Sequence, residues 1–186
     1  VSMGWEQIEG YQNSGGKRVT RQRNAIGPEF FSVMGIPLMA GREFADSDSG
    51  RSPRVAIVNQ TLAKKYFDGR DPLGLHITTA GREKKPVTME IVGVVREARY
   101  GGLKRAVPPV VYTPYNQGSH KAVAEMTFIL RTSGDPLGFA NTVREIVHET
   151  DARVPVSNVQ TQSAQIAELM GQEIAFAKLC TAFAFL

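Results

Sequence analysis

The chain has 186 residues, of which 42% are hydrophobic and 22% charged, so its composition is that of a globular protein with a core and excludes a disordered one. Its formal net charge is +4, and the basic residues are spread out, which argues against the dense basic stripe of a nucleic-acid binder. The single cysteine, Cys180, excludes an internal disulfide but does not decide the cellular compartment.

A short helix is predicted near residue 30. Pro28 suits the first helical position, where its missing N–H costs nothing. Phe30, Phe31 and Met34 then fall on one face, which favours a helix that docks on a sheet over an aromatic patch for a ligand. Gly35 supplies the left-handed residue that ends the helix.

The middle of the chain predicts strands and one further helix. Strands are expected at residues 18–25, 55–58, 75–78, 87–95 and 110–112. Asn59 follows the second of these and is placed to cap a helix over Gln60–Phe67, whose apolar stripe includes Leu62 and Tyr66. This alternation of strands and helices indicates a mixed α and β domain.

The last third predicts two strands and two helices. Strands are expected at residues 126–131 and around Val156, and Asp135 with Pro136 opens a helix that reaches about Glu149. Its inward stripe consists of Leu137, Ala140, Val143 and Val147.

The pattern from Ser163 to the end of the chain is helical. It is amphipathic up to Ile174 and then apolar on nearly all sides, with Lys178 as its one charge. Such a helix is either deeply buried or enters lipid, and a bilayer span needs about 20 apolar residues. Periodicity alone leaves both interpretations open.

Motifs for common enzymatic chemistry are absent from the sequence. There is no glycine-rich loop ending in Gly-Lys-Ser/Thr, no Gly-x-Ser-x-Gly and no His-Glu-x-x-His. His76, His120 and His148 are far apart in sequence, so a hydrolase would need a site assembled from scattered residues. We therefore expect no catalytic, cofactor-binding or metal-binding residues.

Residues 46–50 begin like a calcium-binding loop. Asp46 and Asp48 occupy the first and third positions, but Gly50 stands at the fifth and Ile57 at the twelfth, where an EF-hand needs ligands. Both aspartates are predicted to be solvated loop residues. Cys180, in the most apolar stretch, is predicted to act as a small hydrophobe.

The order of short motifs along the chain is more specific than any one of them. They are GPEFF at 27–31, MGIPL at 34–38, GREF at 41–44, VNQTLA at 58–63, DPLG at 71–74, IVGVV at 91–95, VYTPY at 111–115 and RTSGDP at 131–136. This series resembles the MacB-like periplasmic core domain of ABC-transporter permeases, especially the ADOP group described from acidobacteria. The resemblance covers nearly the whole chain.

The resemblance implies an α+β fold in which a porter-like βαβ subdomain carries an inserted, smaller α/β subdomain and ends in a stalk helix leading to the membrane. It implies four parts, the first of which lacks the opening strands of the porter-like subdomain. These are residues 1–45, the N-terminal portion of the porter-like part; 46–117, the inserted subdomain; 118–162, the C-terminal porter-like portion; and 163–186, the stalk helix and the start of a transmembrane helix.

The resemblance also implies a function. The chain is expected to be a non-catalytic domain in the periplasm, on the inner membrane, that relays ATP-driven motion to the export of a substrate. Its implied partners are an ABC ATPase domain or subunit, a second permease copy, a periplasmic adaptor and, through the C-terminal helix, the membrane; nucleic acid and cofactors are not among them.

An alternative from another class is an extracellular sensor or peptide-binding module. Trp5, Tyr100, Tyr112 and Tyr115 would then supply aromatic contacts to the peptide.

Overall fold

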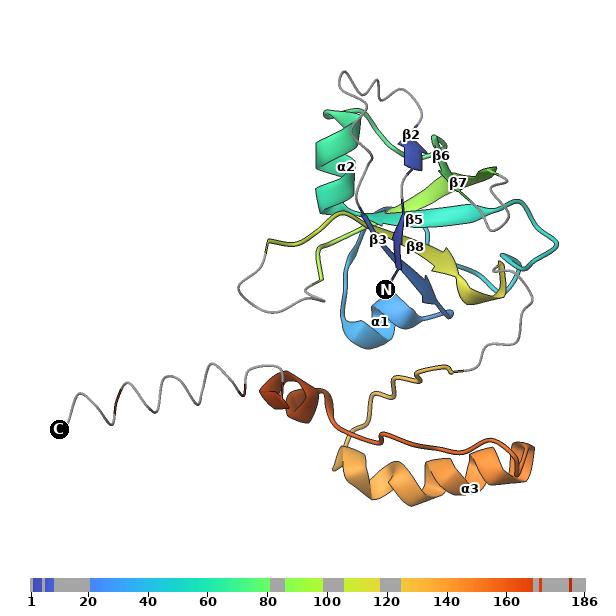
Figure 1. Ribbon diagram of the computed structural model, residues 1–186, viewed down its shortest axis with the longest axis vertical. Coiled ribbons are helices and arrows are strands. Elements are labelled where there is room, and N and C mark those ends of the chain that lie inside the picture. The colour runs from blue at the N-terminus through green and yellow to red at the C-terminus, as the bar shows by residue number, and fades with distance from the viewer. Residues whose placement is uncertain are drawn as a thin grey trace. The chain divides into compact units, whose positions relative to one another are not determined.

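The computed structural model describes residues 2–4, 6–8, 21–80, 86–98, 106–117, 125–168, 171 and 181. Its internal contacts divide the chain into unit 1, Val1–Ile129, and unit 2, Leu130–Leu186 (Figure 1). We describe each unit by itself.

Unit 1 is built on a mixed sheet. Its described strands are β1 (Ser2–Gly4), β2 (Glu6–Ile8), β3 (Arg21–Ile26), β4 (Leu38–Gly41), β5 (Val55–Asn59), β6 (His76–Ala80), β7 (Pro86–Val95) and β8 (Val110–Pro114). They are ordered β1-β3-β8-β5-β7-β6-β2, and β4 also pairs with β7. The strands predicted between residues 18 and 112 are thus confirmed where the structure describes them, whereas β1, β2 and β4 were not predicted.

The first and last strands in this order, β1 and β2, both belong to the N-terminal segment. β1 pairs antiparallel with β3 at one end, and β2 pairs antiparallel with β6 at the other. Only residue 5 separates β1 from β2 in the sequence. The sheet must therefore curl until one short segment reaches both of its ends.

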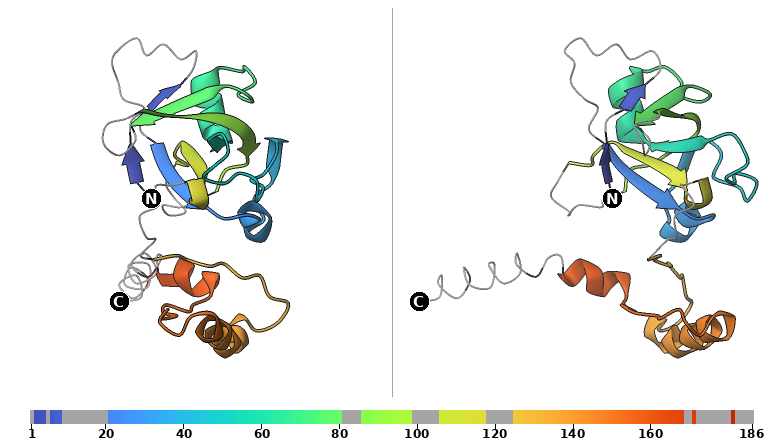
Figure 2. Two further views of the ribbon diagram at one scale, coloured as in Figure 1. Left: turned by 90° about the vertical axis from the view of Figure 1, so that its right-hand side faces the viewer. Right: turned by 45° about the vertical axis from the view of Figure 1, so that its right-hand side comes forward.

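Each face of the sheet carries a hydrophobic core and a helix. Ala56 and Val58 of β5 belong to the cluster that includes α2 (Gln60–Phe67), while Val55 and Ile57 belong to the cluster around α1 (Phe30–Met34). Figures 1 and 2 show strands lying between the two helices. All of β5 is buried because both of its faces are covered.

Helix α1 starts later than the sequence predicts. Pro28 is not helical, because the next residue, Glu29, adopts a left-handed conformation with φ of 59°, which an α-helix cannot include. Gly35 ends the helix in the left-handed region at φ 65°, as predicted. Phe31 is buried and lies edge-to-face against Tyr112 at 4.9 Å, so this is a docking helix.

Helix α2 matches its prediction at both ends. The Asn59 side chain accepts a hydrogen bond from the Leu62 backbone N–H at 3.0 Å and so caps the helix. Leu62, Tyr66 and Phe67 are buried.

In unit 2, a 3₁₀ turn, η3 (Pro136–Phe139), leads into helix α3 (Ala140–Thr150). Asp135 accepts a hydrogen bond from the Leu137 backbone N–H, so the predicted helix start is confirmed. The predicted inward stripe is only partly covered, since Leu137 is 51% exposed and Ala140, Val143 and Val147 are half-buried.

The strands predicted at residues 126–131 and around Val156 are wrong. Both stretches are irregular, and no described strand pairs with either of them. An extended segment becomes part of a sheet only when a neighbour takes up its backbone hydrogen bonds.

The described part of the C-terminal segment is helical at residues 162–168, Gly171 and Thr181, and the rest of the predicted stalk lies outside the described residues. Within the described part of the chain, no helix combines the length and hydropathy needed to cross a membrane. The four-part division stays a prediction, although β3 and β4 of its first part share a sheet with strands of its second part.

Candidate functional site

The two described histidines belong to different units. His76 is exposed on β6 of unit 1, and His148 is exposed on α3 of unit 2; His120 lies outside the described residues. Among the residues that the structure describes, no three His, Cys, Asp or Glu side chains gather in a way that could hold a metal ion. Cys180 also lies outside the residues with a described side chain.

Asp48 is not a solvated loop residue as predicted. It is 5% exposed, and its carboxylate accepts hydrogen bonds from both terminal nitrogens of Arg42, at 2.7 and 2.9 Å. The Ala45 backbone N–H donates a third bond at 2.8 Å. The Arg42 guanidinium holds the pKa of Asp48 below its usual range. Asp46 is exposed, as predicted.

The arrangement of Arg42 and Asp48 disfavours calcium binding by this loop. Both oxygens of the Asp48 carboxylate already face a fixed guanidinium, so the like charge of a cation would be unfavourable there. This pair anchors residues 45–48 against the end of β4.

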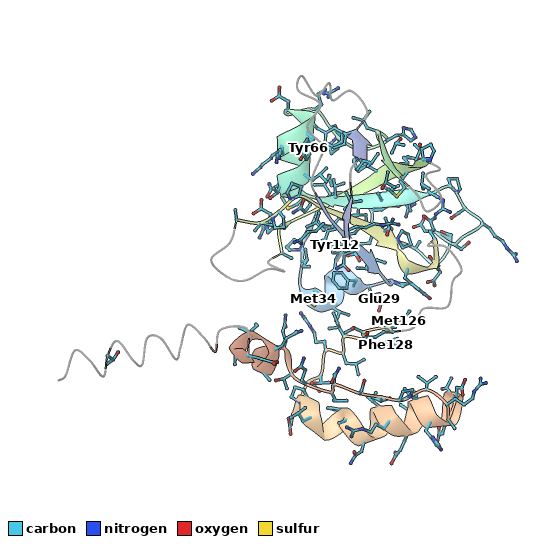
Figure 3. The ribbon with its side chains drawn as sticks, in the orientation of Figure 1. Glu29, Met34, Tyr66, Tyr112, Met126 and Phe128 are labelled. Carbon is cyan, nitrogen blue, oxygen red and sulfur yellow. The ribbon has the colours of Figure 1, made fainter. Side chains whose placement is uncertain are left out.

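Of the four aromatic residues proposed for peptide binding, the structure describes two, Tyr112 and Tyr115, and their environments differ. Tyr112 is fully buried among Phe30 and Phe31, inside unit 1 (Figure 3), whereas Tyr115 is 45% exposed. Trp5 and Tyr100 lie outside the described residues. A buried Tyr112 supports the core, and no described contact favours the peptide-binding alternative.

A buried amide, Gln117, holds the turn that follows β8 in place. Gln117 ends the 3₁₀ turn η2 (Tyr115–Gln117) after β8 and is 4% exposed. Its Oε1 accepts from the Val55 backbone N–H at 3.0 Å, and its Nε2 donates to Ser52 Oγ at 3.1 Å and to the Pro53 carbonyl at 3.0 Å. Its own carbonyl accepts from the Arg54 guanidinium.

A second buried amide, Asn59, lies at the other end of β5. Besides capping α2, its Oδ1 accepts from the Val110 backbone N–H at 2.9 Å, and its Nδ2 donates to the Pro108 carbonyl at 2.9 Å. One fully buried side chain thus ties the start of α2 to the start of β8.

Together these contacts tie the strands, turns and helix α2 of unit 1 to one another through buried polar side chains. Sequence reasoning found the helix-capping role of Asn59 but missed Gln117 and the pairing of Arg42 with Asp48. The capping signal is local, whereas the partners of Gln117 lie 62 or more residues away and carry no local pattern.

Comparison with known proteins gives the family context. The profile of the MacB-like periplasmic core domain matches residues 3–166. The chain is 33% identical over 93 residues to the uncharacterized ABC transporter permease YknZ of Bacillus subtilis, covering 50% of this chain and 22% of that protein. It is 26% identical over 107 residues to the macrolide export ATP-binding/permease protein MacB of Neisseria gonorrhoeae, covering 58% of this chain and 16% of that protein.

The chain therefore spans about a fifth of the length of these curated relatives. Two solved structures are similar in fold. The periplasmic region of MacB from Actinobacillus actinomycetemcomitans matches with a TM-score of 0.54 at 18% identity, over 80% of this chain and 63% of that one. A permease domain from Porphyromonas gingivalis matches with a TM-score of 0.53 at 16% identity, over 87% and 75%. The predicted α+β fold is confirmed.

Proposed function

The chain belongs to the family of MacB-like periplasmic core domains, and we propose that it is the extracytoplasmic part of an ABC-transporter permease subunit that exports a substrate from the periplasm or the outer leaflet. The observation that carries the proposal is the family match, which runs from residue 3 to residue 166 and so includes most of the chain.

In this proposal the domain moves and catalyses no reaction. ATP is hydrolysed by an ABC ATPase domain or subunit, and the resulting motion reaches the periplasm through the helix that begins near residue 162. The packed, clamped body of unit 1 supports this role, because a part that transmits motion must keep its shape under load. Side chains in two covered cores and buried amides at both ends of β5 supply that rigidity.

The proposed setting is the inner membrane, with this domain in the periplasm. The subunit would work as a homodimer with its ATPase and with a periplasmic adaptor.

The test uses the full-length permease that contains this domain, reconstituted with its ATPase in vesicles. Glu168→Cys on the C-terminal helix and Lys64→Cys on α2 are both exposed positions. Bis-maleimides of increasing length are applied, and export is assayed only where a gel shift shows that the two cysteines are joined. We expect short linkers to stop export while ATP hydrolysis continues, and long linkers to restore export.

The matched control is the same double variant treated with a mono-maleimide, which modifies both cysteines without joining them. Export that continues at an unchanged rate with every linker length would show that no relay between these two positions is needed, and the proposed mechanism would be wrong.

A further inference from the structure

Gln117 occupies a particular position along the chain. It is the last described residue of unit 1 before residues 118–124, and the described chain resumes at residue 125 and continues into unit 2 at Leu130. Among the described residues, the hydrogen bonds of Gln117 are the last ones to the strands of unit 1 before the chain continues towards unit 2.

The contacts at this point are concentrated on one short segment. Gln117 makes four hydrogen bonds, and their partners are the consecutive residues Ser52, Pro53, Arg54 and Val55. Three of the bonds use its side-chain amide, which is buried and fully occupied. A surface turn that only had to change direction would not need a buried side chain to hold it.

The strand pairing explains what these bonds resist. β8 runs antiparallel to β5, with Tyr112 opposite Ile57 and Val111 opposite Val58. On its other side β8 pairs in parallel with β3, where Pro114 lies opposite Ile26. A pull on the carboxyl end of β8 is therefore resisted by both neighbours, and the bonds of Gln117 lie between that end and the first pair with β5.

We propose that Gln117 is the mechanical anchor through which unit 1 receives load from the chain that follows it. The biological role of this anchor rests on the proposed function, because a domain that transmits motion has to carry load along its chain. The anchor itself is a property of this chain and is tested without a transporter.

Asn59 provides the matched control. It is also a fully buried amide that bonds to three backbone groups, but it lies at the opposite end of β5. Asn59→Ala should destabilise unit 1 without removing any bond made after the carboxyl end of β8. A role for Gln117 that is only structural would make the two variants behave alike.

The experiment is constant-force unfolding of the full 186-residue chain in optical tweezers, with handles on engineered cysteines and Cys180→Ser as the background. In the first geometry the handles are at Lys64→Cys and Glu125→Cys, so force is applied through Gln117. In the second geometry they are at Lys64→Cys and Ala25→Cys, so force is not applied through Gln117. All three positions are exposed. We expect Gln117→Ala to accelerate unfolding about tenfold more in the first geometry than in the second, the effect of roughly one to two lost hydrogen bonds. Asn59→Ala should accelerate unfolding equally in both.

Equal acceleration of unfolding by Gln117→Ala in both geometries would overturn the anchor and leave the proposed transport function untouched. If that variant does not fold, Ser52→Ala replaces it, because it removes one bond to Gln117 and keeps the residue itself. It should show the same dependence on geometry at smaller amplitude, and an effect independent of geometry would again reject the anchor. Failure of the cross-linking test above would instead reject the relay alone.

Discussion

Asp48 and Asp46 show how two identical residues in one loop can have opposite environments. Asp46 is exposed, whereas Asp48 is buried against Arg42, which lies just after β4. The sequence of the loop is polar throughout, so composition predicts solvation for both. The difference arises because the turn at residues 45–48 brings one carboxylate back onto a guanidinium whose own position depends on the pairing of β4 with β7.

Asp48→Asn should lower the free energy of unfolding by about 1–2 kcal/mol at neutral pH, the usual value of a hydrogen bond to a charged group, reduced because Arg42 is half exposed. The folded-state pKa of Asp48 is depressed, so its contribution is present above the unfolded value near 3.8 and is lost as the pH falls through the lower folded pKa. Urea unfolding of both proteins between pH 7 and pH 2 measures this.

The difference in stability between the wild type and Asp48→Asn should therefore be constant above about pH 5 and shrink below about pH 4. Asp46→Asn is the control and should change stability by less than about 0.5 kcal/mol, as surface substitutions do. A difference that persists undiminished at pH 2 would contradict a contribution from the ionised carboxylate.

At the scale of elements, the paired strands β4 and β7 approach each other closely at two glycines. Gly41 lies opposite Gly93, and Gly41 has a positive φ of 75°. A Cβ on Gly93 would overlap the Arg42 carbonyl oxygen and lie 3.2 Å from the Ile57 side chain. Because the obstacle is backbone, it cannot rotate away. We infer that this close approach requires glycine at residue 93.

Gly93→Ala should destabilise unit 1 by about 1–3 kcal/mol, the cost of overpacking a close contact. Gly27→Ala is the matched control, since a Cβ there meets nothing within 4 Å. Thermal unfolding by circular dichroism would compare them. Equal melting temperatures of the two alanine variants would show that this close approach does not require glycine at residue 93.

The β5–α2 connection depends on Asn59. Asn59→Ala leaves the Val110 and Leu62 backbone N–H groups and the Pro108 carbonyl without this partner. Unpaired buried groups cost about 1–3 kcal/mol each, and we expect a total loss of about 2–4 kcal/mol because the site can partly relax. Chemical denaturation measures it; Thr61→Ala, which removes an exposed bond to Glu97, should change little.

The sequence predicts an element correctly where the residues that determine that element lie close together in the chain. β5, α2 and the start of η3 were predicted because their signals, a β-branched run and a capping side chain, lie within a few residues. β4 was not, because its existence depends on β7, some 50 residues later. Residues 126–131 have the pattern of a strand without a described partner, and pattern alone cannot supply one.

At the scale of the whole molecule, the two units differ in burial. Unit 1 has two cores, whereas among the described residues of unit 2 none is buried. Leu130, Ile146 and Val154 are all more than half exposed. Helix α3 has 11 residues, and a helix of that length is only marginally stable in water without packing. The described part of unit 2 therefore has little packing of its own to stabilise it.

Hydrogen exchange should reveal this difference. In the 186-residue chain, the amides of β5 should be protected by several orders of magnitude more than those of α3, which should exchange almost as in a free peptide. In a full-length permease that contains this domain, further parts of the protein can cover the apolar stripe of α3, so α3 should gain protection there while β5 stays unchanged. If α3 is already as protected as β5 in the 186-residue chain, unit 2 has a core of its own and this prediction is wrong. If α3 stays unprotected in the full-length permease, the rest of the protein does not cover it, and its apolar stripe faces water or another partner.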